Sequence, residues 1–211
     1  MLCQDGHFFM PYFNADMQKG LLMKKITVKQ ITITAALLAI CILSQYFKNL
    51  SVYITGPIVN ACILLATLAA GLGSGVILSI IAPITAFFFT GSDLMAAMPL
   101  LFPAIMLGNI TICFFAWFLN KKFKFKFRLE TGLVLGSIAK AAVMGILIVL
   151  IIFPTFGDAL TVRIGDAAKA TKMLNGARVV FSLTQLTTSL IGSALTIILW
   201  YPLRKVMQNE Q

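Results

Sequence analysis

The sequence predicts an all-α polytopic membrane protein with six membrane-spanning helices and both termini in the cytoplasm. Hydrophobic residues make up 59% of the 211 residues and charged residues only 11%, against about 25% charged in soluble domains. Apolar runs of helical length recur from residue 26 to residue 203. Most lysines and arginines cluster beside these runs, so the net charge of +10 indicates cytoplasmic flanks and not a nucleic-acid partner.

The first predicted helix covers residues 26–47, and lysines at its start place that end in the cytoplasm. Residues 1–22 match none of the later segments, and we expect a disordered leader or a misassigned start there. Residues 23–205 form one predicted membrane domain, followed by a cytoplasmic tail at 206–211.

Two alanines in the first predicted helix, Ala35 and Ala39, are four residues apart. Small residues at this spacing let another helix approach closely. The spacing alone favours a packing seam within the protein over a docking face for another membrane protein.

The second and third predicted helices cover residues 57–70 and 76–89, and both are short for a bilayer. A broken, re-entrant pair is the alternative. Gly56 and Pro57 suit a helix start. The glycine-rich stretch at 71–75 predicts a tight turn on the cytoplasmic side.

The fourth, fifth and sixth predicted helices cover residues 95–119, 129–153 and 178–203. A segment of alternating basic and aromatic residues at 121–128 joins the first two of these. It suits a membrane surface, with rings in the interface and cations toward lipid headgroups. A polar outer segment at 154–177 joins the last two.

A lysine, Lys140, falls near the middle of the fifth predicted helix. A cation there costs at least ~2.5 kcal/mol on insertion scales, so it should face the bundle interior or a wet cavity. A lysine that pairs structurally or reaches the interface is the alternative. No acidic residue lies deep in any predicted span, and Asn109, at a matching depth, is a candidate neutral partner.

Polar residues also share one predicted face of the sixth helix: Gln185 follows Arg178 by seven residues, and Thr188 follows Gln185 by three. Hydrogen bonding between helices explains such residues as well as a ligand pocket does. As a ligand site they would form a polar pocket open to the outside, roofed by the connector at residues 45–55. The candidate substrate-binding residues are Lys140, Arg178, Gln185, Asn109, Thr188 and Asn60.

Several chemistries are absent from the sequence. No G-x-x-x-x-G-K-[ST] motif is present, so the chain itself should not hydrolyse ATP. No histidine lies in the predicted spans, and the cysteines lack metal-type spacing. No pair of carboxylates within the spans suggests a proton relay. We therefore expect no enzymatic activity, no metal site and no cofactor.

The alanine pair of the first helix, the long connector into ITGPIVNA and the GLGSG turn resemble the substrate-binding S component of an energy-coupling factor (ECF) vitamin transporter. The resemblance covers about residues 23–205. It implies a multi-pass protein of the bacterial plasma membrane that captures a small water-soluble vitamin or related solute for ATP-driven uptake. The implied partners are a transmembrane coupling subunit and two cytoplasmic ATPases.

The resemblance also implies roles for particular residues. Ala35 and Ala39 would contact the coupling subunit, which reverses the preference for an internal packing seam. The first outer connector would act as a lid. The lid residues in this sequence are Gln45, Lys48, Asn49 and Tyr53.

The two candidate pocket cations, Lys140 and Arg178, predict an anionic solute, because an uncompensated buried cation is costly. Pantothenate is one solute compatible with the resemblance. Two alternatives remain open: a membrane scaffold or assembly protein whose polar residues only join helices, and a stand-alone secondary carrier. A solute that stabilises the protein against heat would exclude the scaffold, and transport without an ATPase would favour the carrier.

Overall fold

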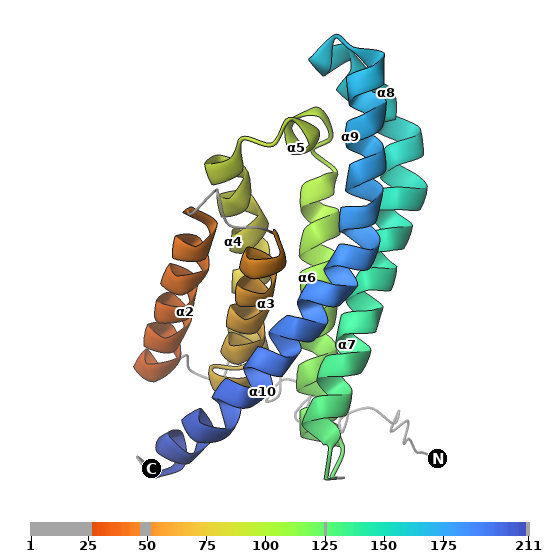
Figure 1. Cartoon of the computed structure of the whole chain (residues 1–211). Helices are drawn as coiled ribbons and strands as arrows, with labels where there is room; N and C mark the ends of the chain where they lie inside the picture. The colour runs from red at the N-terminus through yellow and green to blue at the C-terminus, as the bar shows by residue number, and fades with distance from the viewer. Residues whose placement is uncertain (1–26, 47–51, 125, 210–211) are drawn as a thin grey trace, which may run out of the picture.

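The computed structural model describes residues 27–46, 52–124 and 126–209, and every regular element in these ranges is a helix (Figure 1). Six helical stretches of the described chain are long and apolar enough to cross a membrane. The predicted all-α, six-span fold is therefore confirmed. The elements are α2 (Val28–Tyr46), α3 (Val52–Ala69), α4 (Leu72–Thr90), α5 (Asp93–Ala97), α6 (Leu101–Lys122), α7 (Arg128–Met144), the π-helical η1 (Gly145–Ile152), α8 (Phe153–Ile164), α9 (Ala167–Val179), the π-helical η2 (Val180–Thr184) and α10 (Gln185–Asn209).

Helices α3 and α4 are longer than the sequence suggested. They contain 18 and 19 residues, so the prediction of two short helices is wrong, and the reason for a re-entrant alternative disappears. Pro57 lies inside α3. Continuing the helix through a proline loses one backbone hydrogen bond, whereas an unwound segment in hydrocarbon would leave several groups unsatisfied. The predicted glycine-rich turn at 71–75 is shorter in the structure and consists of Ala70 and Gly71. Gly71 has a φ of +103°.

The fourth predicted helix is divided in two. The short α5 begins after Ser92, whose hydroxyl accepts a hydrogen bond from the Met95 amide at 3.5 Å. The chain leaves helical geometry at Met98, where φ is −128° and ψ is 81°. Proline at the next position disfavours the helical conformation there, and α6 begins only at Leu101. The expected single helix over 95–119 is therefore wrong at its outer end.

The segment predicted as a polar outer connection, 154–177, is almost entirely helical. Helices α8 and α9 form an antiparallel pair that rises above the rest of the bundle (Figure 1). Gly165 turns the chain with φ +73°, and the Asp166 carboxylate caps α9 by accepting from the amides of Ala168 and Lys169. The predicted helix boundaries at residues 153 and 178 thus fall inside continuous helical runs. Likewise, α10 continues into the expected tail as far as Asn209.

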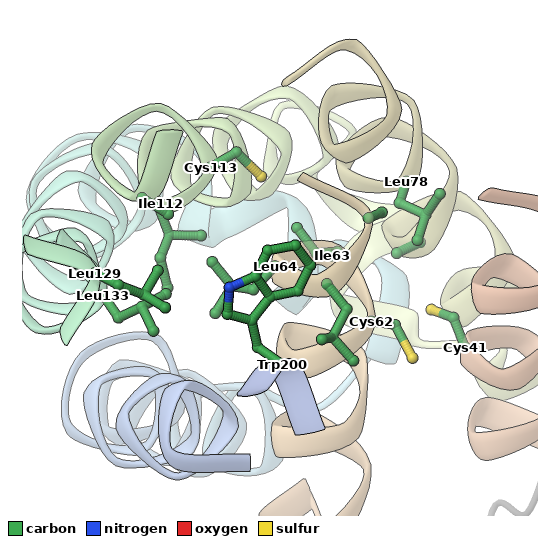
Figure 2. Close-up of a cluster of buried hydrophobic side chains, with 14 residues drawn as sticks. Cys41, Cys62, Ile63, Leu64, Leu78, Ile112, Cys113, Leu129, Leu133 and Trp200 are labelled. Carbon is green, nitrogen blue, oxygen red and sulfur yellow. The ribbon is translucent and has the colours of Figure 1, made fainter. Parts of the chain in front are cut away.

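Two clusters of buried apolar side chains hold the bundle together. The larger cluster surrounds Leu64 of α3 and is closed by Trp200 of α10 (Figure 2). The smaller one joins α6, η1 and α8 around Leu101 and Ile148. Helices α3 and α10 also approach closely at Gly192, where an added Cβ would lie 2.9 Å from the Pro57 carbonyl oxygen.

The two ends of the bundle differ in charge. The starts of α2 and α7 and the ends of α6 and α10 meet at one end, called the basic end below (Figure 1). The other end, formed by α5 and the α8–α9 pair, is called the hairpin end. The described residues of the basic end include Lys29, Lys121, Lys122, Lys124, Lys126, Arg128, Arg204 and Lys205.

Candidate functional site

A cavity of about 290 Å³ lies among α2, α3, α4, α6, α7 and α10, in the half of the bundle nearer the hairpin end. Thr90 and Met95 line its outer part, and the long side chain of Lys140 reaches it from α7. Most of its other lining residues are apolar. Four of the six candidate residues from the sequence line this one cavity: Asn60, Asn109, Lys140 and Gln185.

Lys140 is the only charged residue among the described residues that line the cavity. Its side chain is only 3% exposed, so the charge is removed from bulk solvent. The ammonium donates a 2.5 Å hydrogen bond to the Asn60 side-chain carbonyl of α3. The expected neutral partner was Asn109, but the structure pairs Lys140 with Asn60. Within the described ranges, the one ion pair joins Arg163 to Asp93 at the hairpin end, so Lys140 has no acidic counterpart there.

Asn60 is held in place by the close crossing of α3 and α10. A Cβ added to Gly192 would lie 2.7 Å from the Asn60 Cβ, which means that only glycine fits opposite this side chain without displacement. The sequence alone gave no sign that Gly192 positions Asn60. Two side-chain amides, Asn109 of α6 and Gln185 of α10, complete the polar part of the lining. Each offers a hydrogen-bond donor and an acceptor to a bound molecule.

Thr188 does not line the cavity. It is 1% exposed, and its hydroxyl donates to the Thr184 carbonyl of its own helix at 2.8 Å. The Thr188 Cβ packs against Gly56 of α3. A Cβ added to Gly56 would lie only 3.0 Å from the Thr188 Cβ. Thr188 therefore contributes to packing between α3 and α10.

Arg178 also lies away from the cavity. It is exposed, and its guanidinium donates to the Asn175 side chain one turn earlier at 3.1 Å. The reason is the π-helical η2, which separates Arg178 from Gln185. One extra residue in a helical turn rotates the following residues by about 100°, so a spacing of seven no longer places both side chains on one face.

The candidate lid residues that the structure describes, Gln45 and Tyr53, lie in different helices and differ in burial. Gln45, at the end of α2, lines the cavity and is fixed to α4: its amide donates to the Ala82 carbonyl at 3.1 Å and accepts from the Thr85 hydroxyl at 2.7 Å. Tyr53, in the first turn of α3, is 56% exposed, with its hydroxyl 3.5 Å from that of Thr184. Lys48 and Asn49 lie outside the described residues.

One wall of the cavity was missed in the sequence. Ala82, Pro83 and Ala86 of α4 line it, whereas the predicted pocket used only the second, fourth, fifth and sixth spans. Pro83 was the available signal. A proline inside a membrane helix removes a backbone hydrogen bond and marks a place where the helix faces protein or water, not only lipid.

The predicted docking alanines, Ala35 and Ala39, are both exposed on α2. The buried residues of this helix, Cys41, Ser44 and Gln45, all lie in its last part. Ala35 also lines a second depression of about 620 Å³, bounded by α2, the α3–α4 turn and the end of α6. This depression is called the basic-end groove below.

Candidate metal ligands do not gather in the part of the chain that the structure describes. Within those ranges, no three His, Cys, Asp or Glu side chains lie close enough together to hold an ion. The cysteines there, Cys41, Cys62 and Cys113, are buried and not in disulfides.

The chain matches a known family. The family model described as "ECF transporter, substrate-specific component" matches residues 29–204. This range contains the cavity residues and both docking alanines. Comparison with curated proteins and with solved structures gives no match.

Proposed function

Since the chain belongs to the family of ECF transporter substrate-specific components, we propose that it captures a small, water-soluble, anionic solute in the cavity beside Lys140. Components of this family bind small solutes and work with a coupling subunit and ATPases. The chain is thus a multi-pass transporter subunit. For this chain we propose a transmembrane coupling subunit and two cytoplasmic ATPases as partners, and a vitamin or related compound as solute.

The observation that carries the proposal is the buried, singly charged cavity. A cation out of water is stabilised by an opposite charge or by hydrogen bonds. Lys140 has only the neutral Asn60 as a described partner, so a carboxylate or another anionic group on the solute would complete its surroundings. Asn109 and Gln185 would then bind neutral polar groups of the same molecule. The volume of about 290 Å³ suits a small solute.

The direction of capture follows from the position of the cavity and from the charge of the ends. The cavity lies nearer the hairpin end, and most of the described lysines and arginines lie at the basic end. By the positive-inside rule, we place the basic end in the bacterial cytoplasm and the hairpin end outside. The described ends of the predicted connector at 45–55, which are the end of α2 and the start of α3, contribute Gln45, Val52 and Thr55 to the lining, and this supports a lid role.

The test is mass spectrometry of small molecules retained by the gently purified protein, followed by affinity measurements with the molecule identified. Removing one partner of a buried charged contact typically costs ~2–5 kcal/mol, so Lys140→Ala should weaken binding at least about tenfold. Arg178→Ala is the matched control, because Arg178 is exposed and does not line the cavity. It should bind like the wild type.

Four outcomes would contradict parts of the proposal. A neutral or cationic retained solute would refute the anionic class, and so would an unchanged affinity in Lys140→Ala. Loss of binding in Arg178→Ala would place the site at the hairpin end and not in the cavity. Uptake that continues without any ATPase would indicate a stand-alone carrier.

A further inference from the structure

The basic-end groove has apolar walls and a cationic rim. Ile31 and Leu38 of α2, Ile77 of α4 and Trp117 of α6 line it, together with Lys121. None of these residues belongs to the solute cavity. The groove therefore requires an explanation separate from solute capture.

Aromatic rings hold the cations at this edge. The Lys121 ammonium lies 5.0 Å from the centroid of the Trp117 ring, and the Lys122 ammonium lies 5.0 Å from that of Phe118. Phe118 in turn stacks on Phe114, with centroids 5.5 Å apart and planes within 18°. A tryptophan ring favours the level of lipid headgroups, so the Lys121 ammonium is presented at that depth, and Lys122 follows it directly in the chain.

The positive charge has little compensation among the described residues. Lys124, Lys126 and Arg128 follow Lys122 closely along the chain. The single described acid at the basic end is Glu130, whose carboxylate accepts a 2.6 Å hydrogen bond from the Tyr201 hydroxyl. The other described carboxylates, at residues 93, 158 and 166, lie at the hairpin end.

We propose that the basic-end groove binds one anionic phospholipid, with an acyl chain along the apolar walls and the phosphate beside Lys121 and Lys122. Apolar walls match an acyl chain, and clustered cations at the interface attract anionic headgroups. The start of α4 adds to the match, because Gly71 provides no side-chain cap and Leu72 and Gly73 of the first turn line the groove together with Lys121.

Charge recognition is tested by native mass spectrometry of the purified chain. The coupling subunit is left out, because Ala35, its proposed contact, lines the same groove. Phosphatidylglycerol is compared with phosphatidylcholine of identical acyl chains. We expect the anionic lipid to be retained at least about tenfold more strongly, and the Lys121→Gln/Lys122→Gln variant to lose this preference. The Lys169→Gln/Lys172→Gln variant, which removes two exposed lysines of α9, should keep it.

The binding position of the acyl chain is tested with a pair of tryptophan substitutions on α4. Ile77→Trp fills the groove and should reduce retention of phosphatidylglycerol, whereas Ile80→Trp lies on the same helix outside the groove lining and should not. Both isoleucines are exposed, at 48% and 39%, so both variants should keep the wild-type thermal unfolding midpoint.

The result that overturns the proposal can take several forms. Equal retention of the two lipids would show that charge is not recognised. Unchanged retention in Ile77→Trp would show attraction of headgroups without a seated chain. Displacement of phosphatidylglycerol by excess inorganic phosphate would show a site for free anions. Absence of lipid adducts, together with capture of an acidic protein surface by the same lysines, would assign the groove to a protein partner.

Discussion

At the scale of single residues, the cavity depends on the contact between Lys140 of α7 and Asn60 of α3. This hydrogen bond joins two helices that are far apart in sequence and directs the ammonium into the cavity lining. Its strength is measurable because both partners are buried and can be replaced separately. A buried charged group that loses its partner costs more free energy than the removal of both partners together.

We therefore predict a non-additive pair of substitutions in protein freed of small molecules. Asn60→Ala should lower the free energy of unfolding by about 1–3 kcal/mol, because it leaves the Lys140 ammonium buried without its acceptor. Adding Lys140→Met should recover much of this loss. Asn175→Ala is the control, since it removes the exposed contact with Arg178. Thermal and denaturant unfolding in detergent are the measurements, and a double variant no more stable than Asn60→Ala would contradict the prediction.

Part of the candidate site could be predicted from the sequence. Lys140, Asn109, Gln185 and Asn60 stand out because polar groups in apolar helices must face protein or water, and all four line one cavity. The placement of Arg178 failed because a π-helical segment changes the helical phase and leaves no mark in residue spacing. The pairing of Lys140 with Asn60 depends on how helices cross, which a single helix pattern does not contain.

At the scale of elements, the number of helices was easier to predict than their ends. Hydropathy identifies each apolar run, but Pro57, which suits a helix start, lies inside α3, and glycines that predict a turn lie in the first turn of α4. In a bilayer the need to satisfy backbone groups outweighs these local preferences, so helices continue through residues that end them in water. The outer helical pair, α8 and α9, was missed because its polar composition resembles a loop.

Helix α2 presents an exposed small-residue face, and this face supports a docking prediction. Ala35→Trp or Ala39→Trp should abolish solute uptake in cells that contain the coupling subunit and ATPases, because a bulky side chain prevents close helix approach. Solute affinity of the purified variants should remain at the wild-type value, since neither alanine lines the cavity. Ala142→Trp, at an exposed alanine of α7, is the matched control for added bulk. Equal loss of uptake and binding would indicate misfolding and not docking.

The proposed lid makes a prediction about motion. Spin labels placed at residue 53, in the first turn of α3, and at residue 172, in α9, should move closer together when the recovered solute is added. Closure over a bound solute would exclude water from the Lys140 site, and such loop motions occur within microseconds to seconds. Pulsed electron paramagnetic resonance measures the distance distribution. The same distribution with and without saturating solute would contradict a lid.

At the scale of the whole molecule, composition and charge distribution predicted the fold class, because they are sums over many residues and tolerate local errors. The same sums predict orientation. With Cys3 replaced by Ser, Val162→Cys should react with a membrane-impermeant maleimide in intact cells, since Val162 is 84% exposed in α8. Lys126→Cys, at the basic end, should react only after permeabilisation. The opposite labelling pattern would reverse the orientation.

The length of the helical run that continues from α7 through η1 into α8 has a practical consequence. The helical run Arg128–Ile164 contains 37 residues, or about 55 Å at 1.5 Å per residue, while the hydrocarbon core is only ~30 Å thick. The outer part of α8, with α9 packed beside it, therefore extends beyond the hydrocarbon core. An antibody fragment that recognises this outer part near Asp166 would give a 23.0 kDa protein the external mass needed for particle alignment in electron microscopy.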